Sequence, residues 1–477
     1  MTTGTLIVHP APVEETPATD FMVTVNGQPV FTHQARVSAH PLNQVWPGYQ
    51  RPLEQTEIAS FASWDMTGPV EIVIVSARPV REARVRPGSY GIEPVVEGNT
   101  LRFTLAKPGQ ITVEINGTHQ ALHLFGNPPE ENVPDPKDPN VRYFGPGVHC
   151  PGLIHLRSGQ TVYIAGGAVV YGIIVAEKAN HITIRGRGIL DGSKFSRDDW
   201  GDARGLITIL GCDHVAIEGI ILRDPSLWTV IPVVCQHVHI KNIKLIGLWR
   251  YNADGIDFVN TQHGSVEDSF VRSFDDSIVF KGLIGWGRFK CHAEPVTDIH
   301  VRRCIIWNDW GRALEIGAET IAAEISDLLF EDCDIIHTTH VAMDVQNSDR
   351  GRCHKIDFQN IRIEMDDDFT RPVYQERKDQ VYAVNPGDSY IAPLIVLEII
   401  KAMWSQDVVR GHIDDVHFRD IEVTARGVPP SNLRGFDAGH IVQNVTVENL
   451  RINGQRITSL AAGGFTQNEF VRNVALR

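Results

Sequence analysis

Three aspartates lie close together in two neighbouring segments of the chain. Asp254 is in YNADGIDFVN (251–260), and Asp275 and Asp276 are in SFDDSI (273–278), at intervals of 21 and 22 residues (275 − 254 and 276 − 254). Adjacent carboxylates repel each other, so they persist where solvent, a cation or a reaction needs them. Convergent carboxylates suit hydrolysis of a glycosidic bond, in which a protonated carboxyl donates to the leaving oxygen and an ionised one activates water. Two acidic surface turns are the simpler alternative.

Repeated strands are the elements that must position these carboxylates. Beyond about residue 145, an apolar residue before a polar pair recurs at intervals of 23 to 35 residues, with one interval of 60. The ten markers are Ile184, Ile217, Ile240, Val266, Val301, Phe330, Phe358, Phe418, Val447 and Val471. Two residues after the marker stands Asn or Asp in seven of the ten repeats, and these residues tolerate left-handed backbone dihedrals in turns. Such a unit cannot bury its apolar face alone, so the repeats must stack.

The predicted fold class is all-β, with an N-terminal β-sandwich followed by a right-handed parallel β-helix. Alternating segments such as FMVTVNG and VEIVIVSA predict the sandwich over residues 1–126. A proline-rich linker is expected at 127–144 and the β-helix catalytic domain at 145–477. The 60-residue interval indicates an insertion at about 366–410, which is expected to project from one coil and wall the site. A propeller would need about 40–50 residues per blade. A helical solenoid would need a 3.6-residue periodicity, which these β-branched segments lack.

Composition limits the partners. The 477-residue chain has a formal charge of −14 and no basic run interleaved with aromatic residues, so no nucleic acid partner is expected. No apolar stretch approaches the roughly 18 residues of a membrane span, and no secretory signal is recognisable. Seven cysteines without C-x-x-C spacing fit a reduced cytoplasmic protein, although a secreted protein trimmed of its signal would look the same. We expect no cofactor, and the oligomeric state stays open.

Metal ligation is not expected either. His292, His337 and His340 form no H-x-x-x-H pair and no cluster with cysteine, so ordinary polar or core histidines are the better interpretation.

Stacking brings the aspartates together. Residues one coil apart in a β-helix lie above one another at about the 4.8 Å spacing of paired strands. Intervals of 21 and 22 residues are close to one short coil, so Asp254, Asp275 and Asp276 should converge on one face. Their mutual repulsion and partial burial would keep one proton on the cluster near neutral pH.

The two segments resemble a known family. NADGID with FDDSI is similar to the NTDG…DD signature of polygalacturonase-like enzymes, glycoside hydrolase family 28, and DPSLWTV (224–230) resembles that family's S-x-W segment. The resemblance covers roughly residues 150–475. It implies an inverting glycosidase acting on an oligo- or polysaccharide, with Asp275 as the general acid and Asp254 and Asp276 holding the nucleophilic water.

Two departures argue against plain polygalacturonate as the substrate. Where the family has G-H-G followed by S-I-G, this chain reads GRALEIGAE (311–319), which puts Arg312 at the histidine position. The later R-I-K pair that grips a uronate carboxylate is replaced by MDVQN, with Asp344 in that neighbourhood. Losing cations and gaining a carboxylate disfavours polygalacturonate, although Arg312 could still bind one uronate.

A second resemblance concerns the domain order. The dextranase and isopullulanase group, glycoside hydrolase family 49, joins an N-terminal β-sandwich to a β-helix and also uses three aspartates. CDIIH (333–337) is similar to a segment of that group. An α-glucan hydrolase is therefore the alternative within the hydrolases.

Seven residues are candidates for substrate binding. They are Asn252, Arg312, Glu315, Trp228, Trp310, Lys281 and Asp344. Each has a simpler interpretation, because tryptophans pack in cores and loops, cations neutralise nearby carboxylates, and an isolated glutamate forms surface salt bridges.

Two hypotheses from other classes remain. A uronate polysaccharide lyase or epimerase on the same scaffold would abstract the proton alpha to a carboxylate, commonly with Ca²⁺ or cationic side chains. A non-catalytic carbohydrate-binding β-helix would use the aspartates only in turns. An unsaturated product absorbing in the near ultraviolet would identify the lyase.

Overall fold

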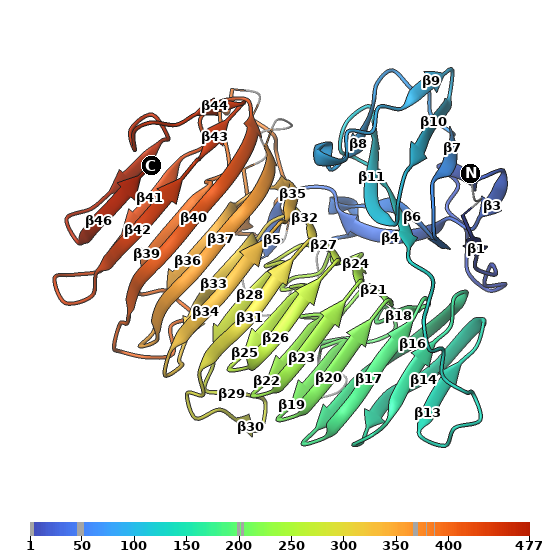
Figure 1. The fold of residues 1–477 in the computed structure, drawn as a ribbon, viewed down its shortest axis with the longest axis horizontal. Coiled ribbons are helices and arrows are strands. Elements are labelled where there is room, and N and C mark those ends of the chain that lie inside the picture. The colour runs from blue at the N-terminus through green and yellow to red at the C-terminus, as the bar shows by residue number, and fades with distance from the viewer. Residues whose placement is uncertain are drawn as a thin grey trace.

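The computed structural model describes residues 4–44, 52–197, 201, 205–365, 371–377, 379–385 and 387–477. Figure 1 shows a long β-helix with a smaller β-domain packed against its flank. The two helices described, η1 (Leu53–Gln55) and η2 (Gly88–Tyr90), are single 3₁₀ turns. Within these ranges, no helix has the length and apolar character needed to cross a membrane.

The N-terminal domain is a β-sandwich of two sheets. One sheet has the order β1-β6-β12-β11-β8, with β4 also paired to β6, and the other has the order β3-β2-β7-β10-β9. Their bounds are β1 Leu6–Val8, β2 Phe21–Val25, β3 Gln28–Val30, β4 His33–Ser38, β6 Thr56–Met66, β7 Val70–Ser76, β8 Ala83–Arg86, β9 Val95–Glu97, β10 Thr100–Leu105, β11 Gly109–Ile115 and β12 Leu122–Asn127. Alternation fills the core, because Val70, Ile72 and Ile74 of β7 are buried between the sheets while Glu71 is exposed. The predicted sandwich is confirmed.

From β13 (Val141–Phe144) onward, 31 strands form one sheet wound into a parallel β-helix, as predicted. Each strand of the central coils pairs with the third strand along the chain, so one coil contains three strands. The marker strands are β17 Asn180–Gly186, β20 Asp213–Glu218, β23 Gln236–Lys241, β26 Gln262–Glu267, β31 Val296–Arg302, β34 Ile325–Glu331, β37 Arg352–Met365, β40 His412–Ala425 and β42 Val442–Glu448. Consecutive markers from Ile184 to Val447 are paired in register.

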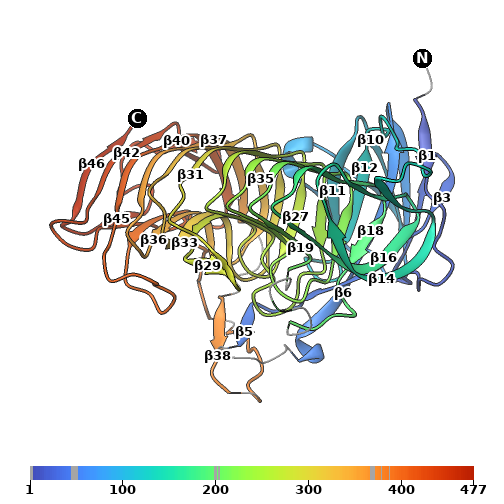
Figure 2. The same cartoon turned by 90° about the horizontal axis from the view of Figure 1, so that it is seen from below.

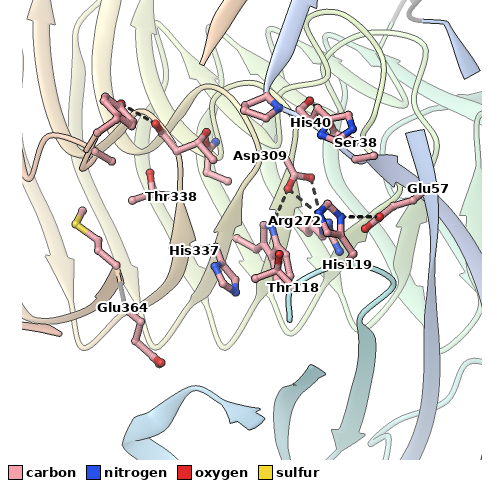
Figure 3. Close-up of a pocket in the computed structure, with 18 of the residues that line it drawn as sticks. Ser38, His40, Glu57, Thr118, His119, Arg272, Asp309, His337, Thr338 and Glu364 are labelled. Carbon is pink, nitrogen blue, oxygen red and sulfur yellow. Dashed lines mark hydrogen bonds and ion pairs between the residues drawn. The ribbon is translucent and has the colours of Figure 1, made fainter. Parts of the chain in front are cut away.

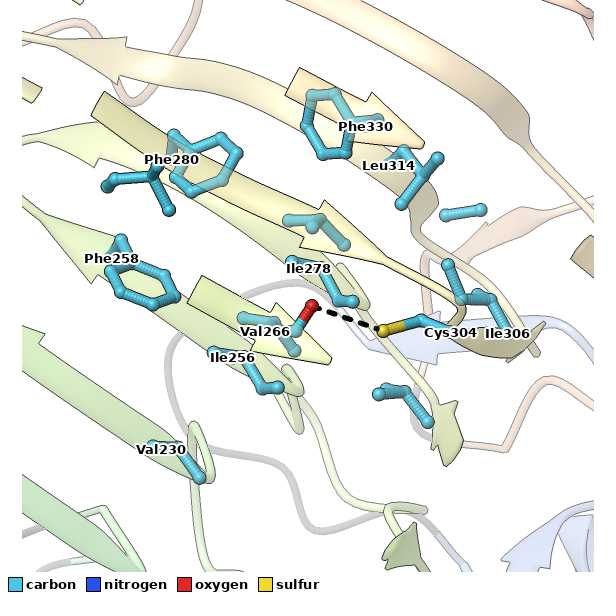
Figure 4. Packing of buried hydrophobic residues seen from close by; sticks show 14 of the residues in the cluster. Val230, Ile256, Phe258, Val266, Ile278, Phe280, Cys304, Ile306, Leu314 and Phe330 are labelled. Carbon is cyan, nitrogen blue, oxygen red and sulfur yellow. Dashed lines mark hydrogen bonds between the residues drawn. The ribbon is translucent and has the colours of Figure 1, made fainter. Parts of the chain in front are cut away.

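Buried aromatic rings, some of them at marker positions, pack against one another in the core of the β-helix. Figure 4 shows Phe280 between Phe258 and Phe330, with ring centroids 5.6 and 5.4 Å apart. Farther along, Phe358 lies between Phe330 at 4.6 Å and Phe418 at 4.9 Å, with nearly parallel rings. Stacking identical positions one strand spacing apart thus builds a continuous apolar column.

The bend after each marker has the predicted conformation. All ten residues two positions after the markers have positive φ, from 51° at Asp268 to 135° at Gly186. The tenth marker is wrong, because Val447 pairs with Leu476 of β46 (Val471–Leu476), whereas Val471 pairs with Val442.

Between β37 and β40 the chain leaves the coil twice. β39 (Ile395–Ile399) lies between these excursions and belongs to the β-helix, since it pairs with β36 (Val341–Asn347) and β41 (Ser431–Arg434). The first excursion carries β38 (Val373–Gln375), which pairs in parallel with β5 (Leu42–Gln44) from the sandwich domain. Figure 2 shows β5 and β38 together below the β-helix. Positions 366–370, 378 and 386 of the predicted insertion lie outside the described residues.

Removing one stacked aromatic ring from the core should destabilise the β-helix. Phe358→Ala is expected to lower the free energy of unfolding by about 3–5 kcal/mol, because the ring is fully buried and its removal leaves a cavity. Urea-induced unfolding measures this change. Phe436→Ala, at a ring that is 43% exposed, is the matched control and should change stability by less than about 0.5 kcal/mol. Equal losses in the two variants would contradict the stacked column.

Candidate active site

The two aspartate segments lie on neighbouring coils. Asp254 precedes β25 (Ile256–Val259), and Asp275 and Asp276 precede β28 (Ile278–Gly282), which pairs with β25. The amide of Gly255 donates to the carbonyl of Asp276 at 2.8 Å, and the amide of Asp275 donates to the carbonyl of Ala253 at 3.2 Å. The turns that carry the carboxylates are therefore joined side by side, as the spacing predicts.

Two glycines make this close approach possible. A Cβ on Gly255 would stand 2.2 Å from the carbonyl oxygen of Ser277, and one on Gly311 would stand 2.5 Å from the carbonyl carbon of Asp275. Both obstacles are backbone atoms, so a larger residue would push the coils apart at the carboxylates.

A cavity of about 280 Å³ opens over these turns. Nine of the ten predicted site residues line it, namely Asn252, Asp254, Asp275, Asp276, Lys281, Trp228, Trp310, Arg312 and Glu315. The tenth, Asp344 on β36, is fully buried behind Arg312, whose Nε is 3.3 Å from its Oδ2. The lining also includes Glu319, Tyr251, Tyr374, Met403, Trp404, Ala318 and Asn43.

Lys281 and Arg312 each face three carboxyl groups. Lys281 Nζ lies 3.0 Å from Asp276, 3.5 Å from Glu319 and 3.9 Å from Asp254. Arg312 approaches Asp344 at 3.3 Å, Asp276 at 3.7 Å and Glu315 at 3.8 Å. Burial alone would lower the pKa of Lys281, but Glu319 and Asp276 outweigh it and raise that pKa well above its usual value. Both side chains therefore carry a fixed positive charge.

The pKa values of the adjacent Asp275 and Asp276 are shifted in opposite directions. Burial, and next the charge of Asp276, raise the pKa of Asp275 to about 7. Burial also acts to raise the pKa of Asp276, but Lys281 and Arg312 outweigh it and hold that pKa well below its usual range. At neutral pH this pair can hold a protonated and an ionised carboxyl side by side.

Asp257 is a fourth aspartate next to Asp254, Asp275 and Asp276, and the sequence did not single it out. It is fully buried, and neither of its carboxyl oxygens has a hydrogen-bond donor among the described residues. Burial and the neighbouring Asp257 raise the pKa of Asp254 well above normal, and burial does the same to Asp257. A signal was present, because Ile256 and Phe258 point into the core and strand alternation turns Asp257 outward toward the carboxylates.

Aromatic residues surround the carboxylates. The ring of Trp228 lies 4.8 Å from that of Trp286 and 5.0 Å from Lys281 Nζ, and Trp310 meets Tyr374 edge-on at 5.0 Å. Tyr251 was missed although it adjoins the predicted Asn252. Tyr374 and Trp404 belong to the insertion that the 60-residue interval predicts as a wall of the site, although no pattern singled out these two residues. Asn43 comes from the sandwich domain, and no local pattern pointed to it.

Other tryptophans near the aspartate coils lie elsewhere. Trp307 stacks under Arg272 at 3.9 Å, and the Trp249 indole donates to Asp224 at 3.0 Å. Figure 3 shows the smaller cavity beside Arg272, about 100 Å³, where the sandwich meets the β-helix. There Arg272 pairs with Asp309 at 3.3 Å within the β-helix, and His119 pairs with Glu57 at 2.8 Å within the sandwich. The two domains meet where Arg272 Nη1 lies 3.2 Å from His123 Nε2 of the sandwich.

One group of described residues has the spacing of metal ligands. Ligand atoms of Asp213, His214 and His237 lie within 4.8 Å of one another. None of the three lines the carboxylate cavity. The imidazoles of His214 and His237 stack with centroids 4.6 Å apart, His237 Nδ1 is hydrogen-bonded to Asp213 Oδ1 at 2.8 Å, and His214 Nδ1 lies 2.9 Å from the same oxygen, which accounts for their convergence.

Replacing Asp275 should stabilise the protein at alkaline pH. Since its pKa rises from 3.8 to about 7 on folding, its proton favours the folded state, and this stabilisation is lost as pH rises through about 7. Asp275→Asn cannot ionise, so it is expected to exceed the wild type by roughly 2–4 kcal/mol at pH 8 and by less at pH 5. Urea unfolding at both pH values measures this, with Asp327→Asn as a surface control. A destabilised variant at pH 8 would contradict the assigned environment.

Comparisons with known proteins support the fold. No family model matches the sequence, and no curated protein matches it. The structure is similar to Dex49A from Penicillium minioluteum, with a TM-score of 0.69, 14% identity, and coverage of 98% of this chain and 96% of that one. It is also similar to a hyperthermoactive exopolygalacturonase from Thermotoga maritima, with a TM-score of 0.51, 15% identity, and coverage of 70% and 83%. The resemblance predicted from the aspartate motifs and the domain order is therefore confirmed at the level of the fold.

Proposed function

We propose that this chain is a glycoside hydrolase that cleaves O-glycosidic bonds of a neutral oligo- or polysaccharide with inversion. The observation that carries the proposal is that the pKa values of Asp275 and Asp276, which line one cavity, are shifted in opposite directions. Two carboxyls whose surroundings push their pKa values apart can divide acid and base roles at one pH. Aromatic side chains beside them suit the C–H faces of a sugar ring.

The proposed mechanism uses the three predicted aspartates. Asp275 donates its proton to the leaving glycosidic oxygen as the bond from that oxygen to the anomeric carbon breaks. Asp276 and Asp254 hold a water molecule that attacks the anomeric carbon from the opposite face, and the carboxylate of Asp276 accepts the water's proton. Lys281 and Arg312 keep Asp276 ionised until that step.

Charge argues for a neutral substrate. Lys281 and Arg312 are the two cations in the described cavity lining, and each already faces three carboxyl groups. A uronate carboxylate bound here would have to compete with these carboxyl groups for an ion pair with Lys281 or Arg312. The same balance disfavours a lyase or epimerase, which must stabilise negative charge next to a uronate carboxylate.

An α-glucan is the neutral substrate that the architecture favours. The shared sandwich and β-helix extend over 98% of this chain in the comparison with Dex49A. The exopolygalacturonase from Thermotoga maritima shares a smaller part of the chain, 70%. This choice agrees with the resemblance of the domain order to the dextranase and isopullulanase group.

Asp275→Asn tests the general acid. The variant is expected to lose about 10²–10⁴-fold in kcat on an α-glucan oligosaccharide, because an amide cannot protonate the leaving oxygen. Reducing ends and product masses measure turnover, and circular dichroism checks folding. NMR of the wild-type reaction should first show the anomer opposite to that of the substrate. Asp327→Asn, at an exposed position of β34 in the same β-helix, should keep full activity. Full activity in Asp275→Asn would remove the assignment.

The pH profile gives an independent test. Since Asp275 must be protonated and has a pKa of about 7, kcat/KM should fall as pH rises above about 7. Asp276 stays ionised to low pH, so no matching fall is expected from it between pH 5 and 7. Initial rates at low substrate concentration from pH 5 to 9 measure this. A rate that climbs through pH 7 would require the roles to be exchanged.

A further inference from the structure

Two walls of the catalytic cavity come from outside the coils that carry the carboxylates. In the first wall, Tyr374 of β38 pairs with Asn43 of β5, and both residues line the cavity. The amide of Val373 donates to the carbonyl of Pro41 at 2.9 Å. The sandwich domain thus holds the ring of Tyr374 in place beside Trp310.

The second wall is the segment after β39, residues 400–411, which places Met403 and Trp404 at the cavity. Asp349, which is fully buried, accepts backbone N–H groups from Gln406 at 2.7 Å and Asp407 at 2.8 Å. The side chain of Gln406 accepts the amide of Ile284 at 3.1 Å. These bonds fix the segment to the β-helix, so the position of Trp404 is set before a ligand arrives.

Two tryptophans that line the cavity, Trp404 of the second wall and Trp310 beside Tyr374, have buried indole N–H groups without an acceptor among the described residues. A buried donor without an acceptor costs about 1–3 kcal/mol, which an arriving hydroxyl oxygen would relieve. Tyr374 stands edge-on to Trp310 and adds an aromatic surface. This combination of indole donors and aromatic surface fits a pyranose ring with free hydroxyls.

The walls differ in charge from the floor. Asn43, Tyr374, Met403 and Trp404 are the wall residues among the described lining, and all four are neutral, whereas Lys281, Arg312 and the carboxyls lie on the floor. A carboxylate placed against the walls would lose its hydration without gaining a cation. The walls therefore select a sugar without charge.

We propose that Trp404, Tyr374 and Asn43 form a subsite for a neutral pyranose unit next to the catalytic carboxyls. The sandwich domain and the insertion then take part together in substrate selection. This inference rests on the proposed function, because the subsite holds the sugar whose bond the carboxyls cleave. Trp404 acts as a donor to a sugar oxygen, and Tyr374 and Asn43 form the facing wall.

Binding to a catalytically disabled chain tests the subsite apart from catalysis. Isothermal titration of full-length Asp275→Asn with isomaltotriose and maltotriose as neutral probes, and with trigalacturonate as the charged probe, should show binding of a neutral probe only. Adding Trp404→Phe keeps an aromatic ring but removes the donor, and is expected to weaken binding about tenfold. Trp404→Ala should weaken it further. Phe436→Ala, an exposed ring outside the cavity lining, should leave binding unchanged.

The outcomes separate this subsite from the hydrolase proposal. In the otherwise native chain, Trp404→Phe should raise KM more than it lowers kcat, since the donor acts on a bound sugar and not on the reacting bond. Unchanged binding in Trp404→Ala, tighter binding of trigalacturonate, or no binding of either neutral probe would overturn the subsite. Neutral binding that depends on Trp404, in a chain that hydrolyses neither probe, would support the subsite and count against the hydrolase.

Discussion

Parallel pairing between successive coils is the interaction on which the candidate active site depends. The ladder joins Gly255 to Asp276 and Asp275 to Ala253, so carboxylates 21 and 22 residues apart in sequence become neighbours across one strand spacing. Its register is fixed by the core, because a slip of one residue would turn the buried side chains of β25 and β28 outward. The apolar column along the axis therefore sets the geometry of the chemistry at the surface of the coil.

That geometry concentrates buried acids, and their charge balance gives the cavity its properties. Desolvation raises the pKa of Asp275, whereas Lys281 and Arg312 keep the neighbouring Asp276 ionised. The cluster lowers stability where its carboxyls ionise, and the stacked rings from Phe258 to Phe418 offset that cost. A site of this kind persists only in a fold with a large continuous core, which many stacked coils provide.

The sandwich domain contributes to the site from two directions. Arg272, three residues before Asp275, lies at the flank of the β-helix, where it contacts Trp307 and Asp309. It also contacts His123 of the sandwich at 3.2 Å. On the other side, β5 leaves the sandwich and pairs with β38 at the cavity. Docking of the domain thus supports the turn that carries Asp275 and Asp276 and also builds one wall of the cavity.

The sequence by itself determined the repeat, its bends and the meeting of Asp254 with Asp275 and Asp276, because these features follow from local periodicity and the fixed spacing of paired strands. It also brought Lys281 and Arg312 into consideration, since both lie near the same motifs. Only the tertiary structure decided that Asn43 lines the cavity, which residues of the insertion reach it, and that Lys281 and Arg312 lower the pKa of Asp276. Contacts between distant segments and the burial of charges depend on how domains and excursions pack. No interval along the chain encodes that packing.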